Sequence, residues 1–139
     1  MGNLSHTSPN TIVEVVSGFP EITSSGYTFD KGPIQLRIGK HTAPHKGFGV
    51  KHIEAEHMQE ILNLGFTSVN EFVKAIIVEN AKIFCEFSDL KGNHRPIILK
   101  ASIGIVVLER KFLESGTIYS VVTAYRRTNP HGIQIGTMK

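Results

Sequence analysis

The chain has almost no cysteine and no long apolar run. Its one cysteine, Cys85, excludes a disulfide framework within the chain and a zinc site built from cysteines. Because Cys85 lies inside an apolar stretch, we expect it to be buried as a small hydrophobic side chain. No segment approaches the ~18 apolar residues of a membrane-spanning helix, so we expect no membrane insertion by this domain. The first residues lack the apolar centre of a secretory signal and match a myristoylation site poorly. The initial methionine does not decide whether the chain is a piece of a larger protein.

Several catalytic signatures are also missing. The sequence contains no Walker A loop, no GxSxG elbow and no GxGxxG at a strand–helix junction. His52 and His57 are five residues apart, and their surroundings fit neither HExxH nor HxxEH. A zinc protease needs two histidines four residues apart on one helix face, so the spacing argues against this chemistry. We expect neither a metal nor a cofactor.

The composition is that of one folded domain. The chain has 139 residues, of which 40% are hydrophobic and 19% charged, and these fractions exclude a disordered chain or a coiled coil. The net charge of +3 permits a nucleic-acid partner without requiring one. We expect a flexible leader over residues 1–10, a single domain over 11–127 and a loose polar tail over 128–139.

The hydrophobic pattern predicts two helices followed by strands. Helical spacing covers residues 50–64 and ends at Gly65, and a capping box from Ser68 to Glu71 begins a second helix over 69–79. Residues 39–49 are predicted to form a loop rich in glycine and histidine. The predicted strands are 11–16, 34–38, 83–88, 96–102, 104–110 and 117–126, where 96–102 and 104–110 form either one bent strand or two. The fold class is α+β, with N-terminal helices packed on a twisted antiparallel β-sheet.

A glycine-rich loop leads directly into the first helix. Gly47 and Gly49 precede Lys51 and His52, which fall in the first turn. A helix N-terminus with free N–H groups and positive side chains can bind an anion, and histidine moves protons near neutral pH. His52 lies off the apolar stripe, so we expect it to be solvent-accessible, with a pKa lowered by the helix dipole. The alternative is an ordinary surface histidine.

His57 differs from His52 because it lies on the apolar stripe. It shares that stripe with Val50, Ile53 and Ile61, so it is either a core-facing histidine with a hydrogen-bond partner or part of a cleft between helix and sheet. Five residues on an ideal helix separate His52 and His57 by about 140°. They cannot both hold one small ion, but they can act around a larger substrate.

The last predicted strand carries hydroxyl groups. Tyr119, Val121, Thr123 and Tyr125 are expected to share one face, with Thr123 and Tyr125 near the strand end. These hydroxyls either bind a phosphate or a base, or simply reflect the β-propensity of Thr and Tyr. Basic residues in the flanking loops form either a solvated surface or a track for RNA phosphates: Lys91, His94, Arg95, Arg126 and Arg127.

The order of these motifs resembles the barnase–EndoU–colicin–RelE superfamily of small RNases. The resemblance is greatest to the toxin domains at the C-termini of contact-dependent growth inhibition proteins and other polymorphic bacterial toxins. It covers about residues 34–126 of the chain. The matching residues are Gly47, Gly49, Lys51, His52, Ile53 and His57, then Tyr119, Val121, Val122, Thr123, Ala124 and Tyr125.

The resemblance implies metal-independent RNA cleavage, in which the ribose 2′-OH attacks phosphorus to give 2′,3′-cyclic phosphate and 5′-OH ends. It makes His52 and His57 the acid/base groups, with Thr123 and Tyr125 orienting the substrate. EndoU proteins place their two histidines on separate turns, whereas His52 and His57 share one predicted helix. His41 or His45 therefore remains an alternative partner of His52. The substrate-binding residues would be Lys46, Lys51, Arg95 and Arg126.

The resemblance also implies a biological setting. Such domains are delivered from the cell surface or secreted as part of a larger toxin, act on tRNA in the target cytoplasm, and are monomers apart from a complex with an immunity protein. Two alternatives use the same residues differently. One is a nucleic-acid or phosphate-binding module without catalysis. The other is an ADP-ribosyltransferase, for whose nicotinamide cofactor no motif is found.

Overall fold

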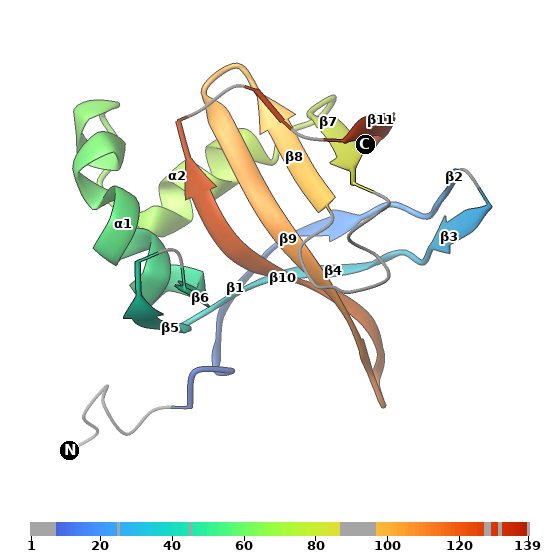
Figure 1. Cartoon of the computed structure of the whole chain (residues 1–139), viewed down its shortest axis with the longest axis horizontal. Helices are drawn as coiled ribbons and strands as arrows, with labels where there is room; N and C mark the ends of the chain where they lie inside the picture. Colours follow the sequence, from blue (N-terminus) through green and yellow to red (C-terminus); the bar gives the residue numbers. More distant parts are fainter. Residues whose placement is uncertain are drawn as a thin grey trace.

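The computed structural model describes residues 8–24, 26–44, 46–86, 97–126, 129–130 and 132–138. Within these residues the protein is an α+β fold with a seven-stranded sheet, two short hairpins and two helices (Figure 1). The helices are α1 (Gly49–Asn63) and α2 (Val69–Ile76). The strands are β1 (Ile12–Phe19), β2 (Ile22–Ser24), β3 (Tyr27–Phe29), β4 (Gly32–Arg37), β5 (Lys40–Ala43), β6 (Lys46–Phe48), β7 (Lys82–Cys85), β8 (Ile97–Ala101), β9 (Gly104–Leu113), β10 (Gly116–Tyr125) and β11 (Ile133–Thr137).

The sheet is mixed, with strand order β1-β4-β10-β9-β8-β7-β11. All neighbouring strands are antiparallel except β4 and β10, which are parallel. The α+β class is confirmed, but the expectation of N-terminal helices on an antiparallel sheet is wrong, because six strands precede α1. The sequence pattern found β1 and β4 as strands. It gave no sign that β4 pairs with β10, about 85 residues further along the chain.

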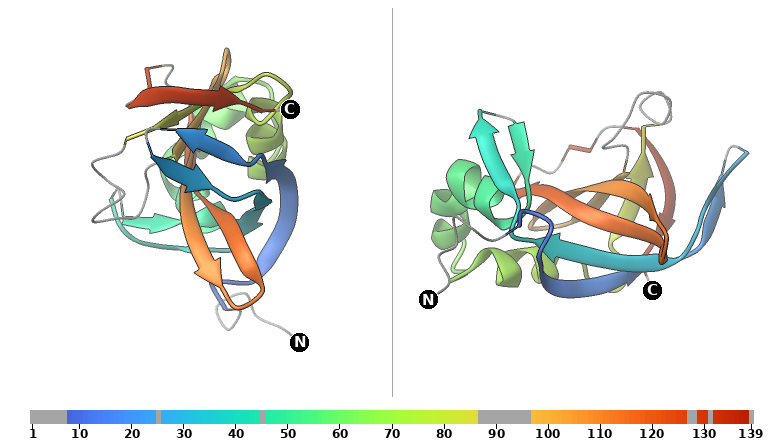
Figure 2. Two further views of the ribbon diagram at one scale, coloured as in Figure 1. Left: turned by 90° about the vertical axis from the view of Figure 1, so that its right-hand side faces the viewer. Right: turned by 90° about the horizontal axis from the view of Figure 1, so that it is seen from below.

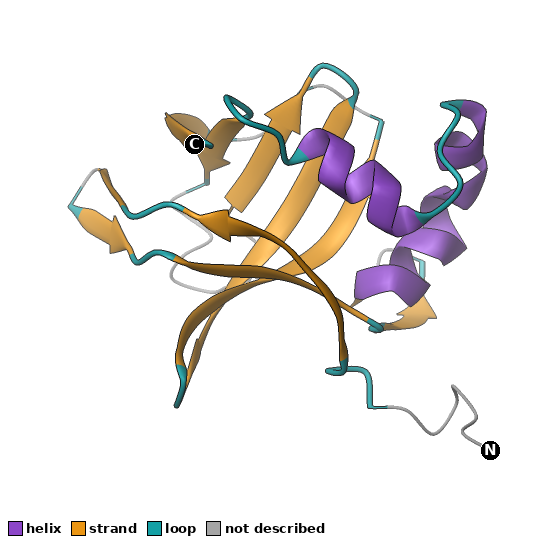
Figure 3. Cartoon of the chain, turned by 180° about the vertical axis from the view of Figure 1, so that it is seen from behind, coloured by secondary structure: helices purple, strands orange, loops and turns teal. Residues whose placement is uncertain are grey.

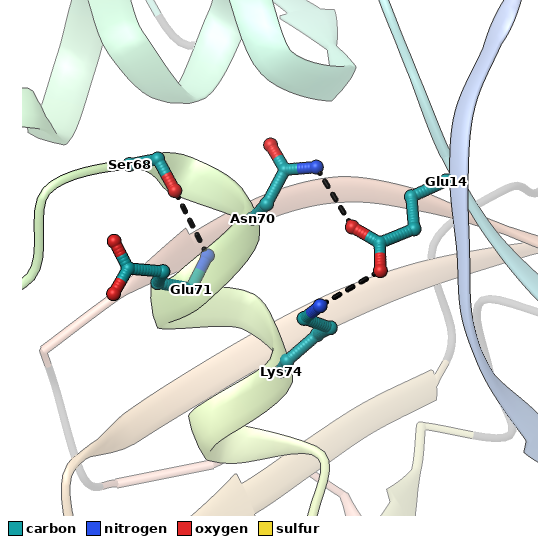
Figure 4. Close-up of polar contacts among 5 residues, drawn as sticks. All are labelled: Glu14, Ser68, Asn70, Glu71 and Lys74. Carbon is teal, nitrogen blue, oxygen red and sulfur yellow. Dashed lines mark hydrogen bonds and ion pairs between the residues drawn. The ribbon is translucent and has the colours of Figure 1, made fainter.

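Both predicted helices are present, and their ends follow local sequence. The Ser68 Oγ accepts a hydrogen bond of 3.2 Å from the N–H of Glu71, which confirms the predicted cap at the start of α2 (Figure 4). Gly65 follows the end of α1 with a φ of +95°, a conformation that glycine adopts without strain. Helix α2 ends at Ile76, three residues earlier than predicted.

The strands after the helices form an antiparallel meander of β7, β8, β9 and β10. The pattern predicted these four strands and their antiparallel pairing, but not their order in the sheet. Residues 96–102 and 104–110 belong to two strands and not to one bent strand. The predicted turn over 89–94 lies outside the described residues.

Short strands were missed in three places. The predicted loop over 39–49 contains the β5–β6 hairpin, residues 22–29 form the β2–β3 hairpin, and part of the predicted loose tail is β11, which pairs with β7. These strands have three to five residues. Alternation over so few positions gives little signal, and pairing with a neighbouring strand stabilises them.

One face of the sheet carries the hydrophobic core, and we call it the helix face. Across β7, β8, β9 and β10 it presents a row of fully buried residues, and Figure 3 shows α2 lying over it. Phe72 of α2 belongs to the same buried cluster. Cys85 is buried on this face too, as expected from its apolar surroundings. The members of the row are Ile83, Leu99, Val106 and Ala124.

Polar contacts fix α2 against the edge strand β1. The Glu14 carboxylate accepts hydrogen bonds from Asn70 Nδ2 at 2.9 Å and from Lys74 Nζ at 2.8 Å (Figure 4). Hydrogen bonding to Lys74 and Asn70 lowers the pKa of Glu14 from its ordinary value of 4.5.

The opposite side of the sheet, which we call the open face, points toward the viewer in Figure 1. The β5–β6 hairpin stands on this side, whereas α2 lies on the other (Figures 1 and 2). Helix α1 lies at the end of β10, beside the hairpin. Among the described residues, neither helix is both long and apolar enough to span a membrane.

Candidate functional site

The register of β10 decides which hydroxyl groups reach the open face. Val121 pairs with Leu108 and Thr123 pairs with Val107, so Val122 is an extra residue that forms a bulge. A one-residue bulge reverses the alternation after it, which sends Thr123 and Tyr125 to the open face while Val121 stays on the helix face. The expectation that Tyr119, Val121, Thr123 and Tyr125 share one face is therefore wrong, because strict alternation ignores the bulge.

His52 is paired with another histidine. Its Nδ1 lies 3.0 Å from Nδ1 of His41, which is on β5. His52 is only 3% exposed, so the expectation of a solvent-accessible side chain is wrong, whereas His41 is exposed. The burial comes from the β5–β6 hairpin, which packs against the first turn of α1 and could not be read from the periodicity of the helix alone.

The glycines of the loop allow this close packing. Gly47 has a φ of +146°, and a Cβ there would lie 2.1 Å from the carbonyl oxygen of Lys40 and 2.9 Å from Nδ1 of His52. Gly49 has a φ of +78°, and a Cβ there would lie 2.5 Å from the carbonyl oxygen of Arg37. Glycine is thus required for both the backbone conformation and the space beside His52.

The start of α1 is less open to an anion than the sequence predicted. The N–H of Lys51 donates to the carbonyl of Ile38 at 2.9 Å, and the N-cap residue Phe48 offers no side-chain hydrogen bond. The Lys51 amide is therefore already satisfied by protein. The same bond fixes the first turn of α1 to the end of β4, next to Arg37.

His57 belongs to a second cluster, at the end of β10. Its Nδ1 lies 2.8 Å from Oε1 of Glu60, and the other carboxylate oxygen of Glu60 accepts the N–H of Arg126 at 2.7 Å. The rings of His57 and Tyr125 are 5.4 Å apart. Glu60 therefore orients the imidazole and joins α1 to the last residues of β10. Of the two alternatives for His57, the one of a core-facing histidine required a hydrogen-bond partner, and Glu60 is such a partner.

Arg37 and Gln35 were not predicted as site residues. They are 7% and 8% exposed, and they lie on the open face because Ile34 and Leu36, which alternate with them along β4, belong to the core. Arg37 donates from Nε and Nη2 to Oε1 of Gln35 at 3.3 and 3.0 Å, and from Nη1 to Oδ1 of Asn10 at 3.1 Å.

Two hydroxyl groups on the open face are buried without a partner among the described residues. These are the Ser120 Oγ and the Thr123 Oγ1. Ser120 pairs with Gln35 across the parallel strands, so both side chains project to the same face. Buried hydroxyls normally have hydrogen-bond partners, so these two are exceptions on the open face.

The predicted substrate-binding residues are spread over this region. Lys46 is exposed on the hairpin, Lys51 is half-buried in the first turn of α1, and Arg126 is exposed after β10. Arg95 and the alternative histidine His45 lie outside the described residues.

The structure thus divides the predicted catalytic residues between two clusters. His52 is with His41, and His57 is with Tyr125. The residues that sequence reasoning missed are Arg37, Gln35, Ser120, Glu60 and the bulge at Val122. The sequence did contain one sign of Arg37 and Gln35, because they alternate with Ile34 and Leu36. Polar residues that alternate with core residues in a strand must lie on the other face of the sheet.

The arrangement has the groups for proton transfer and anion binding. Two imidazoles in contact through their Nδ1 atoms require one to donate and the other to accept, so the pair can give or take a proton. No cluster of three or more His, Cys, Asp or Glu side chains suited to a metal is found among the described residues. Comparison with known proteins found no matching family model, no matching curated protein and no matching solved structure.

Proposed function

We propose that the protein is a metal-independent endoribonuclease. The contact of 3.0 Å between the Nδ1 atoms of His41 and His52 is the observation on which this proposal rests most directly. Cleavage of RNA by its own 2′-OH needs a base for that hydroxyl, an acid for the 5′ leaving oxygen, and positive charge near the phosphate. Histidines, lysines and buried hydroxyls around the open face supply these groups.

In the proposed reaction the 2′-oxygen forms a bond to phosphorus and the bond from phosphorus to the 5′-oxygen breaks. A histidine takes the proton of the 2′-OH, and another histidine gives a proton to the leaving oxygen. His41 is the group of the pair that meets the substrate, because it is exposed, and His52 behind it exchanges the proton through Nδ1.

His57 is the second acid/base group in this proposal. Hydrogen bonding of Nδ1 to Glu60 fixes the tautomer, which leaves Nε2 as the nitrogen that exchanges a proton with the substrate. Thr123 and Tyr125, which share the open face, orient the phosphate or the base. Lys46, Lys51, Arg95 and Arg126 bind the backbone of the RNA.

The first experiment incubates the purified protein with total bacterial RNA in EDTA, beside the variants His52→Ala and His41→Ala. We expect discrete fragments that end in 2′,3′-cyclic phosphate with the wild type, and a loss of at least ~100-fold in rate with either variant. Far-UV circular dichroism of His52→Ala should match the wild type. If the RNA stays intact in EDTA and is cut only with added divalent metal, the proposed mechanism is wrong.

The variant His57→Ala separates its chemical role from its structural one. It should lower both the melting temperature and the rate, since it breaks the tie to Glu60. His57→Gln keeps a polar group beside Glu60 but cannot exchange a proton, so it should preserve more stability while losing the rate. Full activity in His57→Gln would remove His57 from the proposed site.

The alternative function is a nucleic-acid binding module without catalysis. It is favoured by the buried hydroxyl groups of the open face, which can bind a ligand without taking part in catalysis. Tight RNA binding without cleavage, unchanged in His41→Ala, would establish this alternative in place of the RNase.

We also propose the setting that the family resemblance implies. The domain would be carried by a larger toxin delivered to neighbouring bacteria, would cleave tRNA in their cytoplasm, and would be neutralised by an immunity protein. Its net charge of +3 would favour an acidic inhibitor, because opposite fields speed association. Growth arrest on expression in bacteria, absent with His52→Ala, would support this setting.

A further inference from the structure

We propose that Arg37, Gln35 and Ser120 form a subsite on the open face that binds one phosphodiester of single-stranded RNA. This inference builds on the proposed function, since it names how the substrate is held. It assigns a ligand to a buried arginine that has no carboxylate partner among the residues that the structure describes.

The charge of Arg37 is buried but not neutralised. Its three hydrogen bonds go to the amide oxygens of Gln35 and Asn10, and it has no carboxylate partner among the described residues. Glu109, a carboxylate on this face, lies on β9 opposite Ser120, and its Oε1 is 3.3 Å from Nζ of Lys111. Burial of an unpaired charge is costly, so its retention indicates that an anion binds there in the functional state.

The guanidinium has donors to spare. Arginine carries five N–H groups, and the three contacts to Gln35 and Asn10 use three of them. Gln35 holds Nε and Nη2 from one side, which fixes the plane of the guanidinium. The remaining donors match the paired oxygens of a phosphate.

The neighbouring strand adds an unpartnered hydroxyl. Ser120 is 1% exposed, its Oγ has no hydrogen-bond partner among the described residues, and its Cα is the register partner of Gln35. Thr123, further along β10 on the same face, carries a second such hydroxyl. A phosphate held by Arg37 would give these hydroxyls the acceptor that they lack.

The subsite lies next to the histidine pair. Gly49 packs against the carbonyl of Arg37, and Lys51 bonds to the carbonyl of Ile38, so the end of β4 and the first turn of α1 are in contact. His52 is one residue after Lys51. A phosphate held by Arg37 would therefore place the adjoining nucleotides at the His41–His52 pair.

The test measures binding of a short single-stranded RNA in which every ribose is 2′-O-methylated. This probe has phosphodiesters but no 2′-OH, so binding is measured without cleavage. We expect Arg37→Met to weaken binding at least ~10-fold, because a charge-assisted, bidentate contact is lost. The matched control is Arg110→Met, which removes the same charge from an arginine stacked on Phe29 and Phe112.

The salt dependence gives a second readout. Loss of one phosphate contact lowers the slope of log K against log salt by about 0.7 for a single strand. We expect that decrease for Arg37→Met and none for Arg110→Met. Equal affinities and equal slopes for the two variants would overturn the proposal, as would an absence of binding by the wild type.

The variant Gln35→Glu keeps the test valid if Arg37→Met does not fold. It places a carboxylate where the amide oxygen now accepts from Nε and Nη2, so Arg37 gains an internal counter-charge. We expect a higher melting temperature than the wild type and at least ~10-fold weaker probe binding. Unchanged binding in Gln35→Glu would contradict the subsite.

Inorganic phosphate separates the two sources of this ligand. If it raises the melting temperature of the wild type but not of Arg37→Met, and the RNA probe does not compete with it, the site takes a free phosphate and the RNA proposal is overturned. Competition between the two supports it. Because none of these measurements needs cleavage, the subsite can stand even where the RNase proposal fails.

Discussion

The two faces of the sheet are built on opposite principles. On the helix face, Phe72 of α2 packs on fully buried aliphatic residues such as Leu99 and Val106. On the open face, Arg37 and Ser120 are also buried, but among the described residues Arg37 lacks a counter-charge and the Ser120 Oγ lacks a hydrogen-bond partner. The helix face therefore contributes stability, and the open face gives up part of it. Such a loss is expected where a protein keeps groups ready for a ligand.

The largest effect should come from the helix face. Phe72→Ala removes a fully buried ring and should lower the free energy of unfolding by about 3–5 kcal/mol, as measured by urea denaturation. Phe112→Ala is the control, because Phe112 is 70% exposed, and it should change stability by less than ~1 kcal/mol. Equal effects at both positions would mean that the core is not where the structure puts it.

A smaller effect of opposite sign is expected on the open face. Thr123→Val replaces a buried hydroxyl without a partner by a methyl group of the same shape. It should leave the free energy of unfolding unchanged or raise it by up to about 1–2 kcal/mol, while RNA cleavage becomes slower. Thr117→Val is the control, since its hydroxyl donates to Asp30 at 3.1 Å and the exchange loses that bond. A clear loss of stability in Thr123→Val would show that the hydroxyl has a structural partner.

The smallest effect concerns the polar edge of the helix face, where Glu14 bonds to α2. Its pKa is lower in the folded protein than its ordinary value of 4.5, through Lys74 and Asn70, so the bound carboxylate stabilises the fold above that value. This contribution disappears as the pH falls through the lowered pKa. Glu14→Gln should therefore melt slightly below the wild type at pH 7, and the difference should vanish in acid.

The control for Glu14→Gln is Glu79→Gln. Glu79 is exposed and makes no ion pair or hydrogen bond among the described residues. The melting temperature of Glu79→Gln should therefore equal that of the wild type both at pH 7 and in acid. A difference at Glu14 that persists in acid would assign its effect to packing and not to charge.

Local sequence patterns predicted the elements whose causes are local. The cap at Ser68 and the helical spacing of Val50, Ile53 and Ile61 placed both helices, because capping and apolar stripes act over a few residues. The four strands from β7 to β10 were placed by their alternation and the turns between them, but their order in the sheet was not. The sequence also singled out His52, Gly47 and Gly49 as candidate site residues, but it did not predict that His52 is buried.

What the sequence could not provide depends on contacts between distant segments. The burial of His52 comes from a hairpin whose strands have three and four residues, and the placement of Thr123 and Tyr125 comes from one extra residue at Val122. The position of Arg37 beside β10 follows from a parallel pairing about 85 residues apart in the chain. No periodicity within one segment contains this information.

The sequence by itself determined the α+β class, the two helices, the four strands that follow them and the residue types available for chemistry, because propensity, capping and alternation are properties of neighbouring residues. The tertiary structure alone decided that β1 and β4, which precede the helices, join the later strands in one mixed sheet, and that His41 partners His52 while His57 partners Glu60. It also decided that the buried Arg37 donates its hydrogen bonds to the neutral amide oxygens of Gln35 and Asn10. The reason is physical: burial and pairing are fixed by whichever distant segment packs against a residue, and that segment is chosen only when the whole chain folds.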